Sequence, residues 1–225
     1  MSQTAVELRS ERYEELLRAA AECFQSRGFA ATSIDTVARH LGATKGRVYH
    51  YFPSKMDLFN AVRDRAMDLV FAASEDGYTL RGSPAERLHA MSAGHARSMI
   101  DDLPYMHVLL DGLQMLRYST TTQFQREAME AHLTRRDLYE QRFREVVLQG
   151  VAEGQMHIGP QLSITIQSFM STLNGPVFWY RPRGDDTPES RQAIVDDVVR
   201  FALSGLGLSP EHVAQASHQT QKVFA

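Results

Sequence analysis

The segment GATKGRVYHYFPSK, at positions 42–55, concentrates residue types that bind nucleic acid. It carries three basic and three aromatic side chains within fourteen positions. Between residues 28 and 56, four basic residues stand against one acid, Asp35, which gives a local charge of +3 in a chain whose net charge is −3. A short cationic element on a neutral-to-acidic body is typical of a protein that binds an anionic polymer.

Two short helices joined at a glycine turn are expected to carry this segment. Thr32, with Asp35 three residues later, is expected to cap the first helix, and Thr44 is expected to cap the second. Gly42 tolerates the positive φ that a tight turn requires, and Ala38 leaves room for the two helices to cross closely. This arrangement describes a helix-turn-helix.

The second of these helices is expected to present one face to DNA. Most protein contacts to DNA go to phosphate and set the register, whereas a few side chains read base edges. A bidentate contact between arginine and guanine discriminates by about 1–3 kcal/mol, so Lys45 and Arg47 are the candidates for base reading, and Gly46 lets the helix approach the groove. The candidates for phosphate contacts carry hydroxyl, phenol, imidazole or ammonium groups: Thr32, Ser33, Thr44, Tyr49, His50 and Lys55.

Three of these assignments have alternatives. Thr32 could serve as a helix cap, with or without a phosphate contact. His50 could be an ordinary surface residue. Arg47 could contact phosphate instead of a base.

Helical spacing dominates the whole chain, and strand signals are nearly absent. The sequence predicts an all-α protein with an N-terminal three-helix domain at 1–56, a helical body at 57–208 and a weakly ordered, flexible tail at 209–225, in which 210–216 could form a helical turn. About nine helices are expected, at about 10–27, 32–41, 44–51, 54–75, 85–101, 103–117, 124–153, 162–180 and 189–206.

Composition and motifs exclude several classes of protein. Cys23 is the single cysteine, so no intramolecular disulfide is expected, and the chain suits the reducing cytoplasm. The start of the chain has no secretory pattern, and no apolar run approaches the roughly 20 residues that span a bilayer. No nucleophile elbow, Walker loop or HExxH motif occurs, and the histidine pairs lack metal-site spacing, so we expect no enzyme activity, metal or cofactor.

Residues 12–60 resemble the DNA-binding domain of the tetracycline-repressor (TetR) family. The resemblance rests on FQSRGF, then ATSIDTVARHLGATKG, then VYHYFPSK and an apolar DLF, in that order. Arg47 departs from the family pattern, in which a serine, threonine or alanine is common after the glycine. The resemblance implies an all-helical homodimer that binds a palindromic operator in double-stranded DNA, with a helical body that binds a small effector.

The last two long helices are rich in small and apolar residues, among them Ile164, Ile166, Ile194 and Val198. One such pair from each subunit would form a four-helix interface, which agrees with the homodimer that the resemblance implies. The alternative is that these residues belong to the core of a single chain.

The stretch LNGPVFWYRPRGD, at 173–185, is similar to the end of the eighth helix in TetR-type regulators of fatty-acid, sterol and acyl-CoA catabolism. This resemblance implies an acyl-CoA effector with its chain in an apolar cavity. The alternative is that Trp179 and Tyr180 pack at the dimer interface and that Arg181 caps the helix. The residues expected to line the effector cavity are Met67, Phe71, Met99, Leu103, Met106, Leu109, Leu133, Arg136, Tyr139, Phe143, Met170 and Trp179.

These inferences together predict a ligand-responsive DNA-binding repressor that an apolar or acyl-CoA-type effector releases from its operator. The alternative is a DNA-binding regulator without a small-molecule effector.

Overall fold

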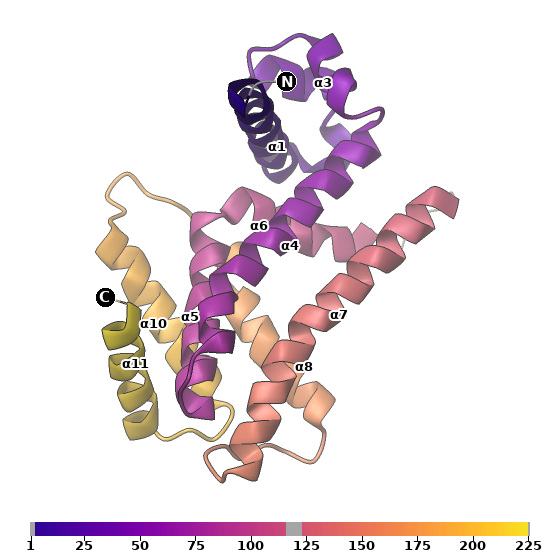
Figure 1. Cartoon of the computed structure of the whole chain (residues 1–225). Helices are drawn as coiled ribbons and strands as arrows, with labels where there is room; N and C mark the ends of the chain where they lie inside the picture. The colour runs from indigo at the N-terminus through magenta and orange to yellow at the C-terminus, as the bar shows by residue number, and fades with distance from the viewer. Residues whose placement is uncertain (1–2, 116–122, 225) are drawn as a thin grey trace. The chain divides into compact units, whose positions relative to one another are not determined.

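The computed structural model describes residues 3–115 and 123–224, and regular structure in these two ranges is entirely helical (Figure 1). The predicted fold class is therefore confirmed. The break expected between the helices at about 103–117 and 124–153, at residues 119–122, lies outside the described residues. The helices of the described ranges are α1 (Gln3–Ala31), α2 (Ile34–His40), α3 (Lys45–Tyr51), α4 (Lys55–Thr79), α5 (Pro84–Asp101), α6 (Leu103–Met115), α7 (Gln123–Ala152), α8 (Leu162–Asn174), α9 (Pro176–Trp179), α10 (Pro188–Ser204) and α11 (Pro210–Phe224).

The chain divides into two compact units, to both of which α4 and α7 contribute. The first unit comprises the residues up to 68 together with 102–132. The second comprises 69–101 together with the residues from 133 onward. No helix in the described ranges is long and apolar enough to cross a membrane.

The core of the first unit forms around α1, which packs against α2 and α6. Leu16, Ala20 and Phe24 recur at four-residue steps along α1 and are almost completely buried. The Phe59 ring of α4 meets the rings of Phe24 and Phe29, with centroids 5.3 and 4.9 Å away. Edge-to-face contacts of this kind add to the area that the rings bury. They attach the start of α4 to the end of α1.

The cap of α2 differs from the prediction. Ser33, not Thr32, is the N-cap, and its hydroxyl accepts from the Thr36 backbone N–H at 3.1 Å. Thr32 is only 1% exposed, and its hydroxyl lies 2.8 Å from the carbonyl oxygen of Gly28 and 3.1 Å from that of Cys23. Thr32 therefore satisfies carbonyl groups at the end of α1, because Gly28, with φ +75°, interrupts the regular helix there.

Replacing Thr32 by valine should lower the free energy of unfolding by about 1–3 kcal/mol, because the one hydroxyl hydrogen that lies between the Gly28 and Cys23 carbonyl oxygens is lost while the side chain keeps its shape. Urea denaturation measures this loss. Ser26→Ala is the matched control, since Ser26 is exposed and also donates to the Cys23 carbonyl, at 3.3 Å. An equal effect of both substitutions would contradict the role given to Thr32.

The second unit is built around α5, against which α8, α9, α10 and α11 pack (Figure 1). Its residues Leu88, Met91, Ala96 and Met99 are almost completely buried. A Cβ atom placed on Gly94 would lie 1.8 Å from the Ala73 carbonyl oxygen of α4. The backbones of α4 and α5 therefore cross too closely for any side chain at this position.

Two predicted features of the C-terminal part were wrong. Residues 210–224 form α11, where a flexible tail with at most a helical turn at 210–216 was expected, and its Val213, Ala216 and Thr220 are buried. The helix expected at 162–180 consists of α8 and the short α9, which meet at Gly175, just before Pro176. A proline begins a helix readily but lacks the N–H that would continue the preceding one.

Candidate nucleic-acid interface

α2 and α3 form the predicted helix-turn-helix. Gly42 has φ +67°, and the backbone N–H of Ala43 donates to the Ala38 carbonyl at 2.8 Å, which closes the turn. Thr44 caps α3, as predicted, by accepting from the Arg47 backbone N–H at 3.3 Å. Val48 is completely buried and fixes which face of α3 points outward.

The outward face of α3 carries the side chains predicted to bind DNA. Lys45, Gly46, Tyr49 and His50 are exposed, and Arg47 is half-buried. The Lys45 ammonium lies 5.6 Å from the centroid of the Tyr49 ring. Ser33 and Thr44, the two N-cap residues, are exposed as well. The structure thus gathers seven of the nine predicted DNA-binding residues on the accessible surface of the first unit.

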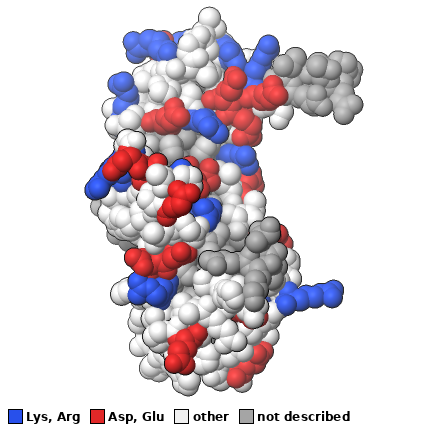
Figure 2. Space-filling model, turned by 90° about the vertical axis from the view of Figure 1, so that its left-hand side faces the viewer, with Lys and Arg blue, Asp and Glu red and all other residues white. Residues whose placement is uncertain are grey.

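Acidic residues of the first unit offset the local positive charge. Arg47 lies 3.5 Å from Glu15, and His40 lies 2.6 Å from Glu22, both on α1. On the face shown in Figure 2, basic and acidic side chains are likewise interspersed. Exposed ion pairs are worth about 0–1 kcal/mol, so a phosphate or base edge can replace Glu15 as the partner of Arg47 at little cost.

Lys55 is placed differently from the prediction. Its ammonium donates to the carbonyl oxygens of Phe29 at 2.7 Å and Ala30 at 3.3 Å, and lies 4.3 Å from the centroid of the Phe29 ring. Burial lowers the pKa of Lys55. In this position Lys55 caps the carbonyl end of α1. Lys55 and the buried Thr32 are thus the two predicted phosphate contacts whose polar groups instead donate to backbone carbonyl oxygens of the protein itself.

Replacing Gly46 by alanine should separate DNA affinity from stability. A Cβ at this position meets nothing within 4 Å, and alanine favours a helix over glycine by about 0.5–1 kcal/mol, so the fold should be as stable or slightly more so. A close approach to the groove should be hindered, and we expect a loss of specific DNA affinity of about tenfold, close to the cost of one poorly made base contact. Fluorescence anisotropy and urea denaturation measure the two effects. An unchanged affinity of Gly46→Ala for DNA would show that Gly46 does not lie close to the DNA groove.

In the second unit, a histidine that no sequence motif indicates, His95, lies at the centre of a buried polar cluster. Nδ1 of His95 lies 2.8 Å from the Tyr139 hydroxyl, and its Nε2 lies 3.0 Å from Oδ1 of Asn174. Since Oδ1 can only accept, Nε2 carries the proton and Nδ1 accepts from the Tyr139 hydroxyl. Burial lowers the pKa of His95 to about 4, so the ring is neutral at pH 7.

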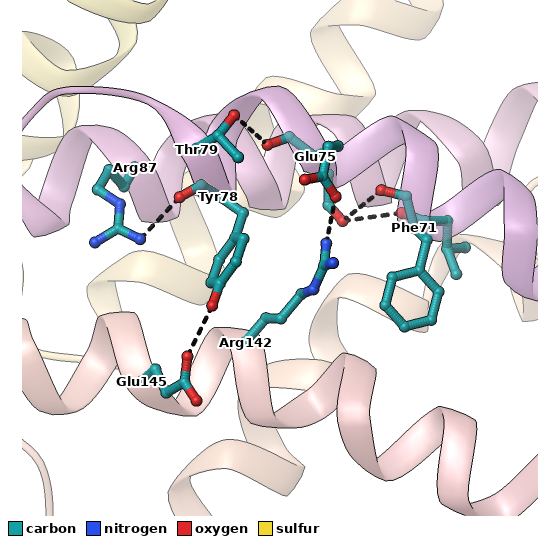
Figure 3. A network of polar contacts seen from close by, with 9 residues as sticks. Phe71, Glu75, Tyr78, Thr79, Arg87, Arg142 and Glu145 are labelled. Atoms are coloured by element: carbon teal, nitrogen blue, oxygen red, sulfur yellow. Dashed lines mark hydrogen bonds and ion pairs between the residues drawn. The ribbon is translucent and has the colours of Figure 1, made fainter.

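A network of charged and aromatic side chains joins α4 to α7 in the same unit (Figure 3). The Arg142 guanidinium lies between the rings of Phe71 and Tyr78, 4.8 and 4.7 Å from their centroids. It also lies 2.5 Å from the Glu75 carboxylate, and the Tyr78 hydroxyl donates to Glu145 at 2.9 Å. Cation–π contacts and a paired charge together make this a strong connection between the two helices.

The residues predicted to bind an effector fall in both units. In the first unit, Met67, Leu103, Met106 and Leu109 are buried. In the second unit, Tyr139 meets Phe71 and Phe143 with ring centroids 4.9 and 5.4 Å apart, beside His95. The remaining members in the second unit are the buried Met99 and Met170, the half-buried Leu133 and Arg136, and Trp179, which is 54% exposed.

An open cavity of about 600 Å³ lies between α4, α5, α10 and α11, away from the predicted residues. Small residues such as Ala93 and Gly94 line it together with the polar Asp76, His89 and Arg97. Its lining thus differs from the largely apolar set of residues predicted from the sequence. Among the described residues, no group of three or more histidine, cysteine or acidic side chains is placed to hold a metal ion.

The exposed face of α3, joined by a glycine turn to α2, whose Ile34, Val37 and Ala38 are buried, defines a helix-turn-helix DNA-binding protein. Family models identify the class further. The model for bacterial regulatory proteins of the tetR family matches residues 16–62, and that for the tetracyclin repressor-like C-terminal domain matches residues 81–206. The chain belongs to the TetR family of transcriptional regulators.

Individual relatives agree with this assignment. The HTH-type transcriptional repressor KstR2 of Mycolicibacterium smegmatis is 25% identical over 197 residues, which are 87% of this chain and 90% of that protein. The crystal structure of the TetR-family regulator PfmR from Thermus thermophilus is 26% identical and has a TM-score of 0.70, covering 85% of this chain and 98% of that one. AibR, in complex with isovaleryl coenzyme A and operator DNA, shares the fold with a TM-score of 0.70 at 22% identity, covering 85% of this chain and 98% of that one.

Proposed function

We propose that this protein is a ligand-responsive repressor that binds a palindromic operator as a homodimer. The observation that carries this proposal is the exposed face of α3, on which basic, aromatic and hydroxyl side chains flank a glycine with open space around it. We further propose that residues 1–56 act as the reading head and 57–208 as the effector-binding and dimerisation body, and that the protein acts in the cytoplasm.

Within the reading head, we assign Lys45 and Arg47 to base edges. Ser33, Thr44, Tyr49 and His50 are assigned to phosphate. We leave Thr32 and Lys55 out of the contact set, because the hydroxyl of the first and the ammonium of the second already bond to carbonyl groups at the end of α1.

The dimer is proposed to form through α8 and α10, which pack against each other in the second unit. Ile194, Val198 and Phe201 recur at four- and three-residue steps on α10, and Phe201 is 72% exposed. Ile164 of α8 and Phe178 of α9 are 57% and 58% exposed. Large exposed apolar side chains gathered on neighbouring helices favour an interface, and a second copy is the partner we propose.

The effector is proposed to be a small apolar molecule or an acyl-CoA. Support comes from the buried aromatic cluster around His95 and from AibR, whose structure contains isovaleryl coenzyme A. We propose that the effector changes the position of α7, and that the network of Arg142, Glu75 and Tyr78 transmits this to α4, which begins in the reading head. Two heads must stand about 34–36 Å apart to enter successive major grooves, so a small rotation of α4 is enough to prevent binding.

The test is release of a labelled operator duplex by an acyl-CoA such as octanoyl-CoA, followed by fluorescence anisotropy. We expect the apparent affinity for the operator to fall about 5–150-fold, the range of typical allosteric coupling. Operator binding that no acyl-CoA changes, with no shift in melting temperature, would favour the second candidate, a DNA-binding regulator without an effector.

A further inference from the structure

Arg63 is a charged side chain in the interior of the first unit. It lies on α4 and is only 1% exposed, which makes it one of the largest fully buried side chains of the described residues. Phe59 and Met67, four residues before and after it on the same face of the helix, are also buried, at 3% and 1% exposure. The guanidinium therefore emerges from an otherwise apolar face of α4.

The partners of this guanidinium are poor. Nη1 lies 3.3 Å from the Met129 sulfur, and Nη2 lies 3.3 Å from the Ala128 carbonyl oxygen. Within the part of the chain that the structure describes, Nε is buried without a hydrogen-bond partner. Among the described residues, no carboxylate lies within ion-pair distance of Arg63. A thioether is a weak acceptor, so most of the five N–H donors of this group are badly satisfied.

Such a side chain is costly to bury, because arginine stays charged at any physiological pH. Burial lowers the pKa of Arg63, and the charge of Asp64 offsets this effect only in part. Arg142 in the same chain shows the usual solution, since Glu75 lies 2.5 Å from its guanidinium. Arg63 has no such counter-ion in the two described ranges.

We propose that Arg63 binds the oxyanion group of an amphipathic ligand, a carboxylate or phosphate on an apolar chain. This inference rests on the proposed effector function and adds a charge requirement to it. Nε–H and the adjacent Nη2–H form the edge of the guanidinium that donates two parallel hydrogen bonds to two oxygens of one anion. The apolar part of the ligand lies along the thioether side chains of Met67 and Met129.

The first arm of the test measures unfolding without any ligand or DNA. Arg63→Met is expected to leave the urea midpoint unchanged or to raise it, because an uncompensated buried charge is replaced by an apolar side chain of similar length. A clear loss of stability would show that Arg63 serves the fold through its contacts to Ala128 and Met129, and would overturn the proposal.

The second arm measures binding by thermal shift and calorimetry, again without DNA. The probes are octanoate, octyl phosphate and octanoyl-CoA, with octanamide as the neutral analogue. At least one of the three anions should stabilise the wild-type protein, and Arg63→Met should weaken that anion by about tenfold or more while changing octanamide little. The anion whose binding Arg63→Met weakens shows whether the site takes a free carboxylate or a phosphate such as that of a coenzyme.

Arg65→Met is the matched control. Arg65 lies two residues further along α4, is half-buried, and is paired with Glu14 at 2.9 Å, so its loss should leave anion binding unchanged. Failure of all three anions to bind the wild type, or equal losses in Arg63→Met and Arg65→Met, would contradict the proposal. Anion binding that depends on Arg63 but does not release operator DNA would instead contradict the proposed regulation and leave the anion site intact.

Discussion

Replacing Phe201 by glutamate is expected to convert the protein to a monomer and to weaken specific operator binding by about 100-fold or more. Phe201 is 72% exposed on α10, so a charge there is tolerated by the isolated chain but is buried in the proposed dimer. Each half-site contributes to the affinity only while the two reading heads are linked. Light scattering coupled to gel filtration measures the mass, and fluorescence anisotropy measures the affinity.

Leu138→Glu provides the control for this substitution. Leu138 is also a large exposed apolar side chain, at 59%, but it lies on α7, outside the proposed interface of α8 and α10. It should leave both mass and operator affinity unchanged. A dimeric Phe201→Glu variant, or equal effects of the two substitutions, would place the interface elsewhere.

Replacing Gly94 by alanine is expected to lower the free energy of unfolding by about 3 kcal/mol or more, the upper part of the range for an overpacked core. The added Cβ would lie 1.8 Å from the carbonyl oxygen of Ala73, a backbone atom that cannot rotate away. Met91 and Ala90 enclose Gly77 of α4 in the same way, so the crossing of α4 and α5 is fixed at two points. Urea denaturation measures the loss. The slope of the unfolding free energy against urea concentration should stay unchanged.

Gly46→Ala is the natural comparison for this experiment, because it makes the same chemical change in a helix where the Cβ meets open space. If Gly94→Ala proved as stable as Gly46→Ala, the close crossing of α4 and α5 would be wrong.

The reading head was largely predictable from the sequence because its determinants are local. The turn at Gly42 and the cap at Thr44 each depend on residues within a few positions of one another. Thr32 shows the limit of such patterns. It fits the spacing of a capping box with Asp35, yet the next residue, Ser33, caps α2, since the Thr32 hydroxyl is bound by the carbonyls of Cys23 and Gly28.

Features that depend on distant residues were not predictable. α11 buries Val213, Ala216 and Thr220. Only valine is strongly apolar, so the sequence of this segment shows no clear apolar face and predicts weak order. His95 meets partners 44 and 79 positions away, and no short motif encodes such a cluster. Arg63 also gave no signal, because only the packing of α4 shows that its charge is buried.

In the proposed mechanism, α4 couples effector binding to operator binding. Its first residue, Lys55, is attached to the end of α1, and its last turns are attached to α7 through Glu75 and Tyr78. We propose α4 as the element through which ligand binding changes operator affinity.

The most direct test of the central claim is a titration of duplex DNA from the region upstream of the protein's own gene, with anisotropy read at several salt concentrations. We predict a saturable complex with two or four protomers per duplex, an affinity that falls steeply with salt, and a strong loss in a Lys45→Ala, Arg47→Ala double variant. A protein that stays monomeric and binds neither this duplex nor any other at low ionic strength would contradict the account.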